Sequence, residues 1–181
     1  MADYVTKCSF PIAGLMAVDV SVPDIAVART FYTEVWGLSV AEERDGALYL
    51  RAGGDAPYVL GLTEGPATAR TVVWEAAPET DMIELHARVA SAGAQDLSGI
   101  GRSSRPGGGQ EFTFRDPVGR GLAIVQGARR AASAKGPSLP TRLAHVNINT
   151  SDMDRDVAFY VEGMGFERTD RSKMMSFLRT N

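Results

Sequence analysis

The sequence DIAVARTFY at residues 24–32 decides the fold, because it recurs as DMDRDVAFY at residues 152–160. The offset between the two copies is 128 (152 − 24), and it holds without a gap to the end of the chain. The same offset aligns further identical residues, namely Val18, Glu34, Gly37, Leu50 and Arg51 with Val146, Glu162, Gly165, Leu178 and Arg179. Self-similarity at one fixed spacing indicates a structural unit that occurs more than once.

The pattern around the first copy predicts a unit of strand, helix, strand and strand. Residues 15–22 alternate valine with small or polar side chains, as in a half-buried strand. Asp24 suits a helix N-cap, and Gly37 suits the end of the same helix. One face of this helix carries an apolar stripe of Val27, Phe31 and Val35.

A hairpin and a second unit follow. Residues 38–44 and 47–51 flank Asp45-Gly46, which is a strong two-residue turn signal. Strands are then predicted at residues 58–63, 71–77, 110–115 and 122–125, with a helix from Thr80 to Ala92 that Gly93 stops. Two such units can bury their apolar sheet faces under helices while the other faces curve around a cavity.

Composition excludes several classes of protein. The chain has 181 residues, 44% of them hydrophobic and 23% charged, which is typical of a soluble globular protein. Its formal net charge of −3 argues against a nucleic-acid partner. The apolar run at residues 10–18 is too short to span a membrane, so we expect a cytoplasmic protein without a signal peptide. The one cysteine, Cys8, is interpreted as reduced and structural.

The sequence has two histidines, and they differ in context. His86 lies outside the apolar positions of its predicted helix and is interpreted as a solvated side chain. His145 opens a predicted strand, residues 145–149, and shares one strand face with Asn147 and Asn149. Such a polar face fits a lined pocket, because amides and imidazoles are costly in a dry core. A lone strand histidine is nevertheless more often structural than a metal ligand.

The third unit carries a resemblance to a known family. HVNINTSD at residues 145–152, AFY at 158–160, GF at 165–166 and SFLR at 176–179 resemble the opening of a catalytic module in the vicinal oxygen chelate superfamily. Residues 24–37 and the DPVG turn at 116–119 resemble the matching parts of an earlier module. This superfamily contains glyoxalase I, bleomycin-resistance proteins and type I extradiol dioxygenases. The two-module layout is most similar to the extradiol enzymes that open catechols and dihydroxybiphenyls.

The resemblance implies a fold and a domain organisation. We expect an α+β fold in which paired βαβββ units form a cupped mixed sheet with helices on the convex side. Residues 1–127 would form a metal-free N-terminal module, residues 128–142 a linker, and residues 143–181 the first half of a metal-binding C-terminal module. The chain would thus hold one complete module and part of a second.

The resemblance also implies a chemistry that this chain carries only in part. In the family, two His and one Glu hold Fe(II) and leave open positions for a bidentate catecholate and O₂. His145 matches the first ligand, and Asn147 and Asn149 are candidates for the substrate pocket. The matching positions of the first module are Ala17, Thr71 and Ala123, none of which is a useful ligand.

Adding the offset to Thr71 and Ala123 places the missing His and Glu near about positions 199 and 251, beyond Asn181. We therefore expect no catalytic residue within this chain and no turnover by it alone. Fe(II), or Mn(II), is expected in a full-length protein and no cofactor on this chain by itself. The expected substrates are a small aromatic diol and O₂.

Two alternatives stay open at this stage. The chain is either a fragment of a longer dioxygenase or a naturally short protein whose third unit needs a partner. Either way we expect a homo-oligomer formed through sheet edges or module exchange. The alternative function is a non-enzymatic, bleomycin-resistance-like binding module, with Asp19, Ser21 and Tyr58 near its cavity. Residues 103–109 are interpreted as a flexible connection, and Trp36 and Trp74 as packing residues.

Overall fold

The computed structural model describes residues 10–134 and 139–180. The first unit comprises β1 (Ile12–Val22), α1 (Ile25–Thr30), the π-helical turn η1 (Phe31–Val35), β2 (Ser39–Arg44), β3 (Ala47–Arg51) and β4 (Leu60–Glu64). The second comprises β5 (Thr68–Ala76), α2 (Met82–Ser91), β6 (Gly101–Arg102), β7 (Gln110–Arg115) and β8 (Gly121–Gln126). The third contains α3 (Met153–Ala158), the π-helical turn η2 (Phe159–Gly163), β9 (Glu167–Arg171) and β10 (Ser176–Arg179).

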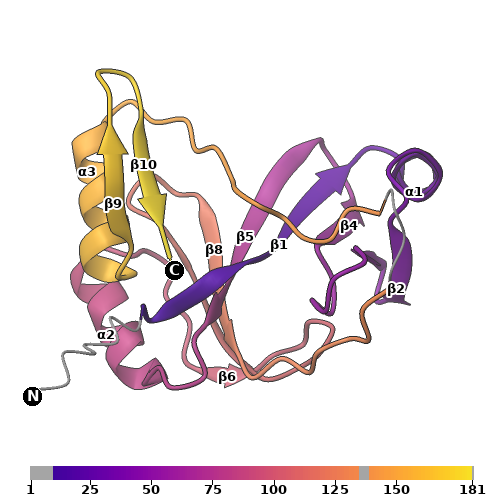
Figure 1. Ribbon diagram of the computed structural model, residues 1–181, viewed down its shortest axis with the longest axis horizontal. Helices are drawn as coiled ribbons and strands as arrows, with labels where there is room; N and C mark the ends of the chain where they lie inside the picture. The colour runs from indigo at the N-terminus through magenta and orange to yellow at the C-terminus, as the bar shows by residue number, and fades with distance from the viewer. Residues whose placement is uncertain (1–9, 135–138, 181) are drawn as a thin grey trace, which may run out of the picture.

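Eight strands form one mixed, curved sheet in the order β2-β3-β4-β1-β5-β8-β7-β6. In each of the first two units the first strand pairs in parallel with the last, β1 with β4 and β5 with β8. The units join where β1 pairs antiparallel with β5. The predicted α+β class with a cupped mixed sheet is therefore confirmed (Figure 1).

Alternation along β5 separates the two faces of this sheet. Val72 and Trp74 contact the apolar cluster that contains α2, whereas Val73 lies in a second cluster on the opposite face. A third cluster lies between the β2–β4 part of the sheet and α1. Each of the first two units therefore packs its helix on the sheet face that the period-2 pattern predicts.

The β2–β3 hairpin follows directly from its two turn residues. Asp45 and Gly46 have φ values of 51° and 73°, so both occupy the left-handed region that a tight two-residue turn requires. Asp and Gly tolerate this region better than most residues. The predicted hairpin is confirmed with the register that pairs Arg44 with Ala47.

Aspartates begin the two long helical segments of the first module. The Asp24 carboxylate accepts hydrogen bonds from the backbone N–H groups of Ala26 and Val27, both at 2.9 Å, which confirms the predicted N-cap. In α2 the cap is Asp81 and not Thr80. The Thr80 hydroxyl donates instead to the Pro11 carbonyl oxygen at 2.8 Å and joins the helix start to β1.

The third unit is docked against the second. Its buried side chains join the core cluster of Trp74 and Phe112, and they are Phe159, Tyr160, Met164 and Phe166. A Cβ at Gly163 would lie 2.8 Å from the Ala92 Cβ, so the missing side chain lets η2 approach α2 closely. In Figure 1, α3 and α2 accordingly lie at the same end of the molecule.

The predicted strand at residues 145–149 is not formed. The segment is extended, with Val146 and Ile148 half-buried and His145 exposed, so the expected alternation of faces is present. Ladder hydrogen bonds need a neighbouring strand. The counterpart segment in β1 lies between β4 and β5, whereas no described strand flanks residues 145–149.

The described parts of the predicted linker have no regular element but are fastened to the first unit. The N–H groups of Gly53 and Gly54 donate to the carbonyl oxygens of Pro140 and Thr141 at 2.8 and 3.0 Å. The Ala134 N–H donates back to the Gly53 carbonyl oxygen at 2.9 Å. These residues therefore follow the surface of the first module. The domain boundaries themselves stay a prediction.

The apolar stripe on the first helix faces outward. Val27, Phe31 and Val35 are exposed, and Ile25 and Ala28 pack on the sheet instead. Trp36 is also exposed, although its ring packs edge-on against Tyr32 at a centroid distance of 5.6 Å, whereas Trp74 is buried as predicted. Both faces of this short helix are apolar, and periodicity alone could not select the one that meets the sheet.

Two further expectations concern the ends of the chain and membranes. Cys8 lies outside the described residues. Of the helices in the described part of the chain, none is long and apolar enough to cross a membrane.

Candidate functional site

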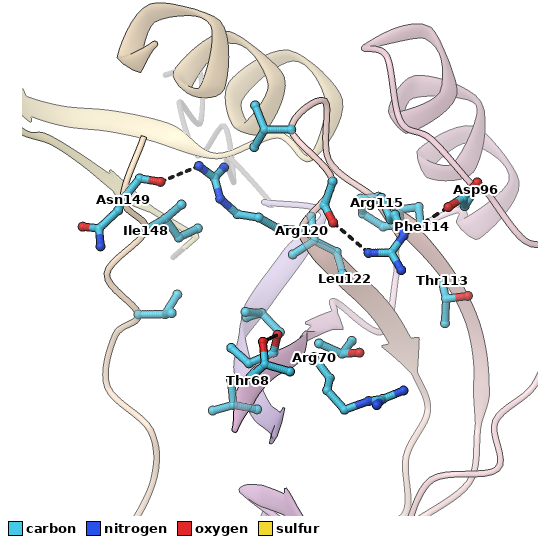
Figure 2. A pocket seen from close by; sticks show the side chains of 18 of the residues that line it. Thr68, Arg70, Asp96, Thr113, Phe114, Arg115, Arg120, Leu122, Ile148 and Asn149 are labelled. Carbon is cyan, nitrogen blue, oxygen red and sulfur yellow. Dashed lines mark hydrogen bonds and ion pairs between the residues drawn. The ribbon is translucent and has the colours of Figure 1, made fainter. Parts of the chain in front are cut away.

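A cavity of about 960 Å³ lies between the sheet of the second unit and the extended segment that follows His145. Asn147 and Asn149 both line it, opposite polar side chains of β5 and β7, among them Thr68, Arg70 and Thr113. Figure 2 shows Asn149 and Ile148 on one side of this space and Thr68 and Arg70 across from them. His145 is not among the lining residues, so the structure brings the two asparagines together with the second unit and not with the histidine.

Arg120 fixes one end of this cavity by binding both units. Its Nη1 donates to Asp116 Oδ2 and to Asp156 Oδ2, each at 2.8 Å. Its Nη2 donates to the Asn149 carbonyl oxygen at 2.5 Å (Figure 2). The Tyr160 hydroxyl lies 3.3 Å from Asp116 Oδ2 and completes the network. One guanidinium thus holds the turn before β8, α3 and the extended segment in a common frame.

The protonation equilibria of this network reflect burial and charge together. Burial alone would raise the pKa of Asp156, but hydrogen bonds from Arg120 and Thr150 outweigh it and lower that pKa. Burial raises the pKa of Tyr160 well above its ordinary value, and the neighbouring Asp116 adds to the effect. The network is therefore a cation between two carboxylates with a neutral phenol beside them.

The concave face of the first module is filled by a second polar cluster. Arg105 Nε donates to Glu111 at 2.9 Å, and its Nη1 donates to the Tyr58 hydroxyl at 2.8 Å and to Asp19. Burial raises the pKa of Tyr58, so its hydroxyl keeps its proton and can donate to Asp19. Ser103 is buried at the start of the same loop. The interpretation of residues 103–109 as only a flexible connection is wrong, because this loop delivers Arg105 into the cup.

The positions in the first module that match the family's metal ligands give no donor set. Ala17 and Ala123 are fully buried in the apolar cluster on the concave face, and Val73 lies between them across the strands. Thr71 lines a smaller cavity of about 250 Å³ beside Arg105. The metal-free state of this module stays a prediction.

The described residues do not form a metal site of three or more donors. Within residues 10–134 and 139–180, no three His, Cys, Asp or Glu side chains lie together as a metal site. His145 is exposed on its segment, and the described residues do not by themselves fit a centre of two histidines and a carboxylate. Any complete centre that uses His145 needs donors from other parts of the protein.

His86 has a structural environment. Its Nε2 lies 2.8 Å from the Ser98 carbonyl oxygen, which can only accept, so this nitrogen carries the proton. Its ring packs edge-on against Phe112 at a centroid distance of 5.1 Å. The side chain is half-buried, so the interpretation as a solvated histidine is wrong. These two contacts help to hold α2 against β7 and against the chain at Ser98.

Comparison of the sequence with models of known protein families identifies the family of this chain. The profile of the Glyoxalase/Bleomycin resistance protein/Dioxygenase superfamily matches residues 14–124 and 142–180. The chain belongs to this superfamily. The match covers both the complete module and the third unit, so the resemblance seen in the sequence is confirmed.

Relatives within the superfamily include characterised enzymes. The chain is 28% identical over 173 residues to an iron-dependent extradiol dioxygenase of Rhodococcus jostii (strain RHA1), covering 90% of this chain and 57% of the relative. It is 25% identical over 175 residues to a manganese-dependent 2,3-dihydroxybiphenyl 1,2-dioxygenase of Geobacillus genomosp. 3, covering 88% and 53%. The chain therefore spans little more than half the length of these curated relatives.

A solved structure shows the same fold. The Mn(II)-bound glyoxalase from Novosphingobium aromaticivorans superposes with a TM-score of 0.89 at 24% identity, covering 95% of this chain and 59% of that one. At this identity the similarity establishes the fold alone. The fold includes the position of the third unit, because nearly the whole chain takes part in the superposition.

Proposed function

We propose that this chain is the front part of an extradiol dioxygenase that cleaves the ring of catechol-type aromatics with Fe(II) and O₂. The observation that carries the proposal is the similarity of nine-tenths of the chain to an iron-dependent extradiol dioxygenase. The manganese-dependent relative makes Mn(II) the second candidate metal. A small aromatic diol and O₂ are the proposed substrates, and a cytoplasmic location is proposed with them.

The third unit has a two-stranded sheet, β9 and β10, and an extended segment at residues 145–149 that pairs with no described strand, and this supports a longer protein. In the first unit, β4 pairs in parallel with β1 and antiparallel with β3, with Leu60 opposite both Val18 and Leu50. Under the 128-residue offset, Val146 and Leu178 are the counterparts of Val18 and Leu50. A strand centred near about position 190 would therefore fit between the extended segment and β10. It would supply the ladder that residues 145–149 need to become a strand.

His145 is proposed as one ligand of the metal, with Asn147 and Asn149 at the substrate pocket. The remaining ligands and the proton-transferring residue would come from beyond Asn181, so none of the described side chains is assigned a catalytic role. Metal affinity depends on the full ligand count. The 181-residue chain by itself is therefore expected to be inactive.

A ligand-binding module without enzymatic activity is the less supported alternative. Small-molecule pockets usually measure about 300–1,000 Å³, and the space left on the concave face beside Arg105 is about 250 Å³. Tyr58 is fully buried there, and Ser21 is buried with its hydroxyl donating to the Pro66 carbonyl oxygen. The cup of the first module is thus largely occupied by its own side chains.

The test uses the protein produced from its complete gene. We expect an intact mass near that of about 290 residues, bound iron or manganese, and a coloured ring-fission product from catechols. His145→Ala should abolish metal binding and turnover. The matched control is His86→Gln, which alters the other histidine of the present sequence and should leave both unchanged. A product of 19.4 kDa without metal or turnover would overturn the proposal.

A further inference from the structure

The helix of the first unit is apolar on two sides. Ile25, Ala28 and Tyr32 pack against the sheet. The opposite side, which we call the α1 outer face, is exposed by 65%, 45%, 70% and 53% at Val27, Phe31, Val35 and Trp36. Helices that are hydrophobic all round are normally buried all round. Nothing among the described residues covers this face.

The third unit shows how an equivalent face is used. Under the offset, Phe31, Val35 and Trp36 correspond to Phe159, Gly163 and Met164. Phe159 and Met164 are buried, because η2 packs against α2 of the second unit. This repeat therefore forms a helix-to-helix contact between units where a partner helix is available. In the first unit the same positions are apolar and have no such partner among the described helices.

The position of α1 in the molecule limits which surfaces can cover its outer face. α1 lies at one end of the long axis, whereas α2, α3, β9 and β10 lie toward the other (Figure 1). Strands that extend the third unit would lie between β10 and residues 145–149, where Val146 and Ile148 pack on the cluster that contains α2 and not on the cluster that contains α1. The α2 surface that covers η2 is already occupied. Among the described residues, the exposed helix face of the same kind is the α1 outer face itself, so a second copy of this chain is the occupant that they offer.

The size of the face suits a symmetric pair. With side-chain areas of about 150–250 Å², the exposed fractions leave roughly 400 Å² of apolar surface, near the largest patches on monomers. Two such faces would bury about 800 Å², and a homodimer interface that is about 65% apolar would then total on the order of 1,200 Å². This is the lower end of the range for specific, stable interfaces, about 1,200–2,000 Å².

Two charged side chains lie on α1 and η1 beside the face. Arg29 forms an ion pair with Glu43 of β2 within one molecule, and Glu34 is exposed, so its carboxylate must stay at the solvated rim of a contact. Two faces can therefore meet without leaving this cation unpaired. From these observations we propose that the α1 outer face binds the same face of a second copy across a two-fold axis. The inference concerns assembly and does not rest on the proposed enzymatic function.

The first test measures the mass of the assembly by light scattering at micromolar concentration, using the product of the complete gene. Val35→Asp places a charge in the centre of the face and should weaken association at least about 100-fold, halving the measured mass. The matched control is Ile83→Asp, since Ile83 is 75% exposed on α2, outside the face. It should leave the mass unchanged. A monomeric wild type, or an unaltered mass for Val35→Asp, would overturn the proposal.

The second test asks which surface covers the face. The fluorescence of Trp36 should be shielded from quenching by iodide in concentrated protein and should become quenchable when the protein is diluted. The Trp36→Phe variant shows how much of the total fluorescence comes from Trp36. Trp74 is buried within one molecule and should not respond. Shielding of Trp36 that persists in a monomer would mean that the protein's own chain covers α1.

The mass measurement also distinguishes a different contact. An assembly mass that falls for Phe177→Asp on β10 but not for Val35→Asp would assign the contact to the β10 edge. Either this result or persistent shielding of Trp36 would overturn the proposal.

Discussion

The first and third units carry the same sequence repeat and bury it differently. Phe31 in the first unit is 45% exposed, whereas its counterpart Phe159 in the third is 3% exposed. The difference does not lie in the helices, since both are short α-helices continued by a π-helical turn. It lies in the surface that each helix faces, which is α2 for the third unit and solvent for the first. The comparison teaches that a repeat specifies an apolar face, while the neighbouring unit decides whether that face is core or surface.

The largest expected effect tests this contrast directly. Phe159→Ala removes a buried ring and should lower the free energy of unfolding by about 3–5 kcal/mol. The matched change Phe31→Ala removes the same atoms from an exposed position. Urea denaturation of both variants measures the difference. Similar losses in the two variants would contradict the assignment of Phe159 to the core.

The next effect concerns the ionic network that attaches the third unit. Arg120→Met leaves the carboxylates of Asp116 and Asp156 without their cation and should cost about 2–3 kcal/mol at pH 7, less than a fully buried pair because Arg120 is partly exposed. The first unit offers the control, since Arg29→Met breaks an exposed pair with Glu43 and should cost less than about 1 kcal/mol. Equal losses of stability in the two variants would mean that the Arg120 network contributes no more than an exposed ion pair.

The same network predicts a dependence on pH. Because the pKa of Asp156 is lowered in the folded protein, its contribution to stability is present above its ordinary pKa and is lost as the pH falls through the lowered value. The destabilisation caused by Arg120→Met should therefore shrink as the pH falls below about 4. Denaturation curves of wild type and variant at several pH values measure this. A difference that stays constant into acid would exclude Asp156 as its source.

A smaller effect should follow from the close approach of η2 to α2. Gly163→Ala places a Cβ 2.8 Å from the Ala92 Cβ and should destabilise the protein by about 1–2 kcal/mol, because the helices must separate. Combining it with Ala92→Gly should restore part of the loss. In the first unit the counterpart is Val35, which has no such neighbour within its own chain, and Val35→Ala, measured at a concentration low enough to keep the protein monomeric, should change stability by less than about 0.5 kcal/mol. If the double variant is no more stable than Gly163→Ala alone, the destabilisation does not come from the contact with Ala92.

The sequence predicted the elements with local causes and missed those set by distant contacts. The Asp45-Gly46 hairpin and the Asp24 cap were predictable, because each depends on one or two residues and on backbone conformation. The strand at residues 145–149 was not, since a strand needs a neighbour that the described chain does not provide. The outward face of α1 was missed for the related reason that both of its faces are apolar.

The candidate site was predictable only as a set of residues. Asn147 and Asn149 line a cavity, but their neighbours Arg70 and Thr113 come from strands that no spacing rule connects to them. Arg120 was not predicted as a site residue, although one signal was present: an arginine directly after the Asp116–Gly119 turn, followed by aspartates on a later helix. Its role depends on contacts across 29 and 36 residues, which sequence patterns do not encode.

The fastening of residues 131–134 and 139–141 along residues 53–55 has a consequence for how the third unit finds its place. Leu143 also packs on the cluster of the first unit, and Val146 packs on the cluster of the second, so the tether between the two attached parts is short. A short tether gives a high effective concentration of the attached unit near its own docking surface. Docking of η2 on α2 should therefore tolerate weak contacts, and capture of the third unit by a neighbouring molecule should compete poorly with docking in the same chain.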